Sequence, residues 1–191
     1  MIDYESFQKE LEAGIISTCS KERTYQGYEC ASLVNGDGIR TVLWFSGCNH
    51  FCDGCHNPST WDPNSGEYKL KDIGTSIMKS LDTPFCSGIT FSGGDPLHPR
   101  NRAEAAVFAK LVKKYLPNKT IWLYTGYEWD DIKHLTDILE YVDVLVDGKF
   151  KKDLAEINYP WAGSTNQKVI DVHDSLEANK IILHKVHPSN R

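Results

Sequence analysis

Short apolar segments alternate with amphipathic ones along most of this chain. Six runs are rich in β-branched and other apolar residues and end in turn residues, which predicts strands. They cover residues 41–46, 88–91, 120–124, 142–146, 168–172 and 181–186. Between them, apolar residues recur at helical spacing over 71–81, 101–115 and 128–139. The alternation predicts βαβ units and places the chain in the α/β class.

Alternating strands and helices favour a mostly parallel sheet, because parallel neighbours need a long crossover connection. Five or six strands are too few to close an eight-stranded barrel. We therefore expect a partial (βα) barrel, with a flat doubly wound sheet as the alternative. The chain divides into an N-terminal extension, residues 1–32, and one domain, residues 33–191. Within the extension, 3–13 are expected to form a short helix ending at Gly14.

Length and charge narrow the class of protein. A chain of 191 residues can bury one substantial core, and a net charge of −5 argues against a nucleic-acid partner. No apolar run is long enough for a membrane span, and the polar, acidic N-terminus is unlike a signal peptide. We expect a cytoplasmic protein, in which clustered cysteines indicate a metal centre or catalysis. Cys19, Cys30 and Cys86 lie far apart and are expected to be incidental or buried thiols.

The other three cysteines lie close together, directly after a predicted strand. Cys48, Cys52 and Cys55 have the spacing C-x3-C-x2-C. A [4Fe–4S] cluster takes four ligands, so three thiolates on one loop suggest a cluster with one iron left open for a small molecule. A zinc site completed by His50 or His56 is the alternative.

Further motifs follow the next three predicted strands. They are GGD at residues 93–95, TGY at 125–127 and DGK at 147–149. Loops after parallel strands meet at one edge of a sheet, so these turns and the cysteine loop are expected to form one site. Glycines after a strand allow the backbone to approach a ligand closely, and Asp95 adds an acceptor or anchors the turn.

The cysteine spacing resembles that of the radical S-adenosylmethionine (SAM) enzymes, in which the open iron binds the amino and carboxylate groups of SAM. Other segments narrow the resemblance to the activating proteins of anaerobic ribonucleoside-triphosphate reductases, within the glycyl-radical-enzyme activases. They are VNGDGIR at 34–40, HNPSTW at 56–61, FSGGDPL at 91–97, YTGY at 124–127, YVDVLVDGKF at 141–150 and GSTNQK at 163–168. The resemblance implies an α/β fold, a partial (βα) barrel of radical SAM type with a mostly parallel five- or six-stranded sheet.

The same resemblance implies the chemistry. Cys48, Cys52 and Cys55 would hold a [4Fe–4S] cluster that passes one electron to SAM, giving methionine and a 5′-deoxyadenosyl radical. That radical would take a Cα hydrogen from the glycine loop of the large subunit of anaerobic ribonucleotide reductase. Reduced flavodoxin or a similar protein would supply the electron. The alternatives are an activase of another glycyl-radical enzyme, such as pyruvate formate-lyase, and a non-catalytic zinc-binding module.

By resemblance, a set of residues would contact SAM. They are Gly54, Ser92, Gly93, Gly94, Asp95, Thr125, Asp147 and Lys149. The turn at 92–95 would receive the amino group, and the backbone of Gly54 would lie near the adenine. Lys149 would balance the SAM carboxylate, or Asp147 would hold a monovalent cation; an ordinary exposed turn is the other interpretation of these two residues.

Three further features of the sequence are Asp37, Arg40 and residues 163–168. Asp37 stands where the family commonly has proline, which leaves a looser turn. Arg40 is expected to be a surface cation. Residues 163–168 match the family, and they would either shape the far side of the SAM pocket or receive the partner's glycine loop.

Overall fold

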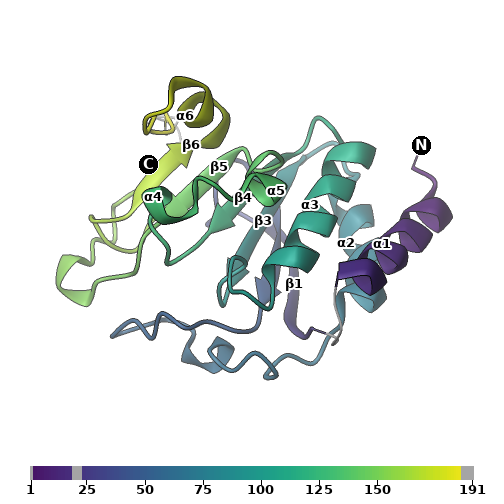
Figure 1. The fold of residues 1–191 in the computed structure, drawn as a ribbon, viewed down its shortest axis with the longest axis horizontal. Helices are drawn as coiled ribbons and strands as arrows, with labels where there is room; N and C mark the ends of the chain where they lie inside the picture. The colour runs from purple at the N-terminus through teal and green to yellow at the C-terminus, as the bar shows by residue number, and fades with distance from the viewer. Residues whose placement is uncertain (1, 19–22, 186–191) are drawn as a thin grey trace.

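The chain folds into one six-stranded sheet with its longer helices packed on one side (Figure 1). The computed structural model describes residues 2–18 and 23–185. The strands are β1 (Tyr25–Ser32), β2 (Ile39–Phe45), β3 (Cys86–Gly93), β4 (Thr120–Tyr124), β5 (Val144–Asp147) and β6 (Lys168–Asp171). The helices are α1 (Tyr4–Thr18), α2 (Leu70–Leu81), α3 (Arg102–Tyr115), α4 (Trp129–Ile132), α5 (Thr136–Leu139) and α6 (Val172–Ala178), with 3₁₀ turns η1 (Pro58–Thr60) and η2 (Lys152–Leu154).

The sheet is mixed, which corrects the expectation of a mostly parallel one. Strands β2 to β5 are parallel neighbours, whereas β1 pairs with β2 and β6 with β5 in antiparallel fashion. Only residues 33–38 join β1 to β2, too few for the crossover that a parallel pair requires. Between β5 and β6 the chain forms only η2 and returns at the same edge, so that pair is antiparallel as well.

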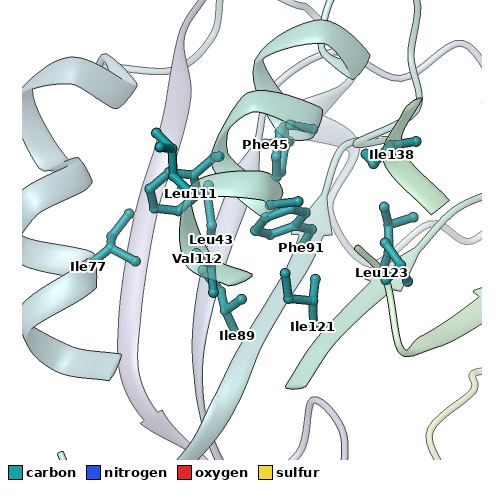
Figure 2. Packing of buried hydrophobic residues seen from close by; sticks show 14 of the residues in the cluster. Leu43, Phe45, Ile77, Ile89, Phe91, Leu111, Val112, Ile121, Leu123 and Ile138 are labelled. Atoms are coloured by element: carbon teal, nitrogen blue, oxygen red, sulfur yellow. The ribbon is translucent and has the colours of Figure 1, made fainter. Parts of the chain in front are cut away.

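The strand order runs from β1 to β6 without reversal, so the doubly wound alternative is wrong. Crossovers of one hand that proceed in one direction place their helices on one face of the sheet. The main core lies on that face, where strand side chains meet helices α1, α2, α3 and α5. Figure 2 shows part of it: Leu43, Phe45, Ile89, Phe91, Ile121 and Leu123 from the strands, with Ile77, Leu111, Val112 and Ile138 from the helical layer.

Two predicted elements differ from the structure. The predicted helix 128–139 is two short helices, α4 and α5, because Leu135 between them has the non-helical angles φ −80° and ψ 62°. Its apolar periodicity persists because both pieces bury side chains in the core. The strand predicted over 181–186 is wrong for its described part, which forms only an isolated bridge between Leu183 and Ile170. Val186 lies outside the described residues.

The first thirty residues contribute more than the sequence pattern indicated. Helix α1 continues through Gly14, where an added Cβ would lie 2.6 Å from Val107 Cγ1 of α3; the glycine permits close packing instead of ending the helix. Phe7 and Leu11 of α1 are fully buried. Strand β1 was not predicted, because an edge strand with one exposed side can carry many polar residues. In the described part of the chain, no helix combines the length and the apolar character needed to cross a membrane.

Arg40 is fully buried on the sheet face opposite the main core, so the expected surface cation is wrong. Its guanidinium donates hydrogen bonds to Thr90 Oγ1 (2.8 Å), Thr120 Oγ1 (2.9 Å) and three backbone carbonyls. Its Cζ lies 5.4 Å from the centre of the Trp122 ring. Burial lowers the pKa of Arg40 to about 10, so this fixed cation stays charged at neutral pH.

Candidate functional site

The cysteine loop follows β2 and is closed at its base by backbone hydrogen bonds. The amide of Gly47 donates to the carbonyl of Thr60 at 2.7 Å, and that of Cys48 to the carbonyl of Trp61 at 3.1 Å. In Figure 1 the segment between β2 and α2, drawn in blue, runs along the lower edge of the molecule. The loop is therefore anchored at both ends, and Phe51, Asp53 and Gly54 between them are exposed.

All three thiols of the loop are partly exposed and none forms a disulfide. Burial raises the pKa of Cys48 to about 11 and also raises the pKa of Cys52. The backbone amide of His50 opposes the shift at Cys48, and that of Phe150 opposes it at Cys52. Without metal Cys48 and Cys52 are thiols at neutral pH, so a metal centre must displace their protons when it binds.

The cysteine loop borders a cavity. Within residues 2–18 and 23–185, no group of three His, Cys, Asp or Glu side chains is placed to hold a single metal ion. Cys52 and Cys55 line a cavity of about 400 Å³, together with Gly54, Phe51 and Trp61. Space for a group larger than an ion is thus present beside two of the three thiols.

The histidines of the zinc alternative have other partners. His50 Nε2 lies 2.5 Å from Asp95 Oδ2, so that nitrogen is engaged away from the cysteines. His56 is exposed, with its ring 5.4 Å from that of Phe150. Both histidines thus have contacts outside the set of three cysteines.

Asp95, in the turn after β3, is the best-connected residue of the predicted site. Its side chain is 2% exposed. Oδ1 accepts from the amide of Leu97 (2.7 Å), and Oδ2 from the amide of Gly126 (3.1 Å). The Thr125 hydroxyl lies 3.0 and 2.9 Å from the two oxygens. The carboxylate is fully used inside the protein, so Asp95 anchors the turn instead of offering a free acceptor to a ligand.

The backbones of the turn after β3 and of the start of the cysteine loop lie so close together that no side chain fits between them. An added Cβ at Gly94 would lie 2.6 Å from the carbonyl oxygen of Gly47, and one at Gly93 2.8 Å from the backbone of Phe45. Asn101 Nδ2 donates to the carbonyls of Ser46 and Asp95, both at 2.8 Å. Glycine is therefore required at 94 by this close approach, whether or not a ligand is present.

The turn after β5 is built around a second buried aspartate. Asp147 is fully buried, which excludes the interpretation of an ordinary exposed turn for this residue. Its oxygens accept from the amides of Trp129 and Lys168, both at 3.0 Å, and Lys168 Nζ lies 3.6 Å away. Its neighbour Lys149 is exposed, and its positive charge partly opposes the burial that raises the pKa of Cys52. The Lys149 charge therefore acts on the cysteine loop, whereas Asp147 bonds to α4 and β6.

Residues 163–168 brace the segment that follows β5. Gln167 accepts from the amides of Gly163 (3.0 Å) and Ser164 (3.2 Å) and donates to the carbonyl of Gly148 (2.9 Å). Asn166 donates to the carbonyl of Lys149 (2.9 Å), and buried Ser164 accepts from the amide of Lys151 (3.1 Å). These bonds supply the physical role of the GSTNQK element, which the sequence left open.

The braced segment in turn touches the cysteine loop. An added Cβ at Gly54, whose φ is +72°, would lie 3.3 Å from Lys152 Cδ and 3.5 Å from Phe150 Cε1. The β5 end and the cysteine loop therefore face each other across Gly54. Ser92 lies at the end of β3 beside Trp44 of β2.

Three residues of the site escaped the sequence analysis. His50 was considered only as a zinc ligand, Asn101 only as the start of a helix, and Gln167 only as part of a motif. The sequence carries only a weak signal for the pair of His50 and Asp95. A histidine and an aspartate can form a hydrogen bond, but nothing in the sequence near either residue indicates that the two are in contact.

The comparisons with known proteins agree with the iron–sulfur interpretation. A family model described as "4Fe-4S single cluster domain" matches residues 34–170. An anaerobic ribonucleoside-triphosphate reductase-activating protein of Enterobacteria phage T4 is 43% identical over 142 residues, which is 74% of this chain and 89% of the relative. Proteins of the same name from Pasteurella multocida (43%; 75% and 94% covered) and Escherichia coli K12 (40%; 76% and 96% covered) are similar over 148 residues. The chain belongs to the family of anaerobic ribonucleoside-triphosphate reductase-activating proteins.

Proposed function

We propose that this protein is a radical SAM activase that generates a glycyl radical on the large subunit of an anaerobic ribonucleoside-triphosphate reductase. The relatives carry the name of that reductase, and the family model is a [4Fe–4S] domain. The observation that carries the proposal is the cysteine loop: it holds three thiols, two of which line a cavity, and it is joined through His50 to the glycine turn after β3.

In this proposal Cys48, Cys52 and Cys55 would hold a [4Fe–4S] cluster. With cluster and SAM bound, the cluster would supply the electron that converts SAM into methionine and a 5′-deoxyadenosyl radical, and that radical would take a hydrogen atom from a glycine of the reductase, leaving 5′-deoxyadenosine and a glycyl radical. No residue of the chain is required as a general base. The protein would hold the cluster and SAM in a fixed relative position and exclude water from the reacting atoms.

The predicted SAM contacts divide into two groups. Asp95 and Thr125 use their side chains inside the protein, so they shape the turn whose main-chain groups, from Ser92 to Gly94, meet the amino group of SAM. Lys149 balances the SAM carboxylate, and Gly54 keeps the backbone open near the adenine. Asp147 acts through the turn and not as a direct contact, because its oxygens already accept from two backbone amides.

The remaining parts of the proposal follow from the family. The open six-stranded sheet is proposed to be the partial barrel of radical SAM enzymes, with the strand ends of β2 to β5 carrying the site. A reduced flavodoxin or a similar donor supplies the electron, and a cytoplasmic location keeps the thiols reduced.

The test is an anaerobic electron paramagnetic resonance (EPR) experiment on the reconstituted protein with SAM, a strong reductant and its cognate reductase. We expect a glycyl doublet on the reductase that depends on this chain. An intact reduced-cluster signal without a doublet would show that the reductase is not the substrate.

A cysteine pair provides the matched control. Cys52→Ala should abolish formation of 5′-deoxyadenosine, because the cluster loses one of three ligands, whereas Cys30→Ala, an exposed thiol on β1, should leave it unchanged. Undiminished 5′-deoxyadenosine from Cys52→Ala would remove that residue from the cluster site.

A further inference from the structure

We propose that His50 is the positioning residue of the cysteine loop, joining it through Asp95 to the turn that faces SAM. This inference rests on the proposed function. It assigns a role to a side chain that is neither a cluster ligand nor part of the SAM-binding set.

The first argument is placement. His50 lies two residues after Cys48 and two before Cys52, so its side chain controls the middle of the loop. That side chain is only 9% exposed, although the residues around it in the loop are partly or largely exposed. Through it the loop bonds to the buried side chain of Asp95.

The second argument is the fit of the histidine ring. Nε2 lies 2.5 Å from Asp95 Oδ2, and the ring packs against Tyr127 with centroids 4.6 Å apart at 79°. At Gly126 an added Cβ would collide with the ring, so this glycine leaves the space that His50 fills. The ring is thus held between the turns after β3 and β4 on three sides.

The third argument is what the attachment does for the metal ligands. The backbone amide of His50 lies against the Cys48 sulfur. Hydrogen bonds to ligand sulfurs and the groups that orient ligands tune both the potential and the retention of iron–sulfur clusters. A fixed His50 side chain holds this amide in place, while Asp95 on its other side shapes the glycine turn. The His50 side chain therefore fixes the position of the cluster ligands relative to the backbone of residues 92–94, which faces SAM in the proposed function.

The experiment compares His50→Ala and His50→Gln in the full chain reconstituted without oxygen. The Gln side chain can place an amide N–H near the position of Nε2, and Ala cannot. His173→Ala, a half-exposed histidine on α6, is the control. The readouts are iron and sulfide bound per chain, the cluster's midpoint potential, and the change in the reduced-cluster EPR spectrum on adding SAM.

For His50→Ala we expect cluster retention against a chelator to fall about 10- to 100-fold, the usual cost of losing a group that orients metal ligands. The midpoint potential should become more negative as the amide contact with Cys48 loosens, and the SAM-induced spectral change should be lost. His50→Gln should recover most of the retention and the potential. In a protein that already carries Asp95→Asn, His50→Ala should cause little further loss of cluster retention, because both substitutions weaken the same hydrogen bond between His50 and Asp95.

The inference is overturned if His50→Ala binds iron and titrates like the unchanged protein, or if Gln behaves like Ala. The retention and potential measurements need no SAM. If the unchanged protein shows no SAM-dependent spectral change, the proposed function fails, while the role of His50 is still decided by these two readouts.

Discussion

The turns after β3 and β5 each place a buried aspartate at the end of a parallel strand, yet they use it differently. Asp95 binds groups from two other segments: His50 of the cysteine loop, and the hydroxyl of Thr125 and the amide of Gly126 in the turn after β4. Asp147 accepts from the amides of Trp129 on α4 and Lys168 on β6, and Nζ of the same lysine lies 3.6 Å away; neither partner belongs to the cysteine loop. The first aspartate therefore joins the site together, and the second holds the frame that carries Lys149 and Phe150.

The difference shows that a motif position does not define a role. Both aspartates follow apolar strands and precede or follow glycine, and both are expected from sequence to touch SAM. Their hydrogen-bond partners differ: Asp95 bonds to the cysteine loop through His50, whereas Asp147 bonds to the amides of Trp129 and Lys168. Substitutions in each of the two turns test this distinction.

The largest effect should come from Asp95→Ala. Removal of the carboxylate leaves His50, Thr125 and two backbone amides without their acceptor, and uncoupling a buried network of this kind costs about 3–5 kcal/mol of unfolding free energy. Iron binding should fall with it. Anaerobic denaturant titration and iron analysis would measure both, and a variant with near-normal stability would contradict the anchoring role.

Asp147→Ala should be the next most harmful change. Two buried amides lose their acceptor, at about 2–4 kcal/mol in total. Iron binding should fall less than in Asp95→Ala at equal folded fraction, because no cysteine-loop side chain bonds to Asp147. Equal iron loss in the two variants would erase the distinction between the turns.

A glycine pair should give intermediate effects. Gly94→Ala forces a Cβ toward the Gly47 carbonyl, and overpacking costs about 1–3 kcal/mol. Gly148→Ala has room, with its nearest atom 3.8 Å away, but its φ of +86° strains alanine by about 1–2 kcal/mol. Gly94→Ala should reduce iron binding more, because Gly47 directly precedes Cys48. The reverse order in iron analysis would place the sensitive contact at the other turn.

Gln167→Ala should have the smallest effect on stability, about 0.5–1.5 kcal/mol, because Gln167 is only partly buried and water can enter the space that its side chain leaves. The released segment around Gly148 and Lys149 should instead exchange its amide hydrogens faster. Hydrogen-exchange mass spectrometry of 148–151 would detect this, and unchanged exchange would show that GSTNQK does not brace the segment.

The sequence by itself determined the elements with strong local signals. Apolar runs predicted β2 to β6 because buried strands need continuous apolar side chains, and helical spacing predicted α2 and α3. The cysteine spacing predicted an iron–sulfur centre because three ligands on one loop need no tertiary information to be recognised.

Only the tertiary structure decided the features that depend on distant partners. His50 meets Asp95 across 45 positions of sequence, and Arg40 is buried because acceptors on β3 and β4 surround it. The antiparallel edges, the polar strand β1 and the brace at 163–168 likewise depend on which segments lie beside them. Local pattern reports which side chains prefer burial, whereas pairing of distant polar groups is set by the packing that brings them together.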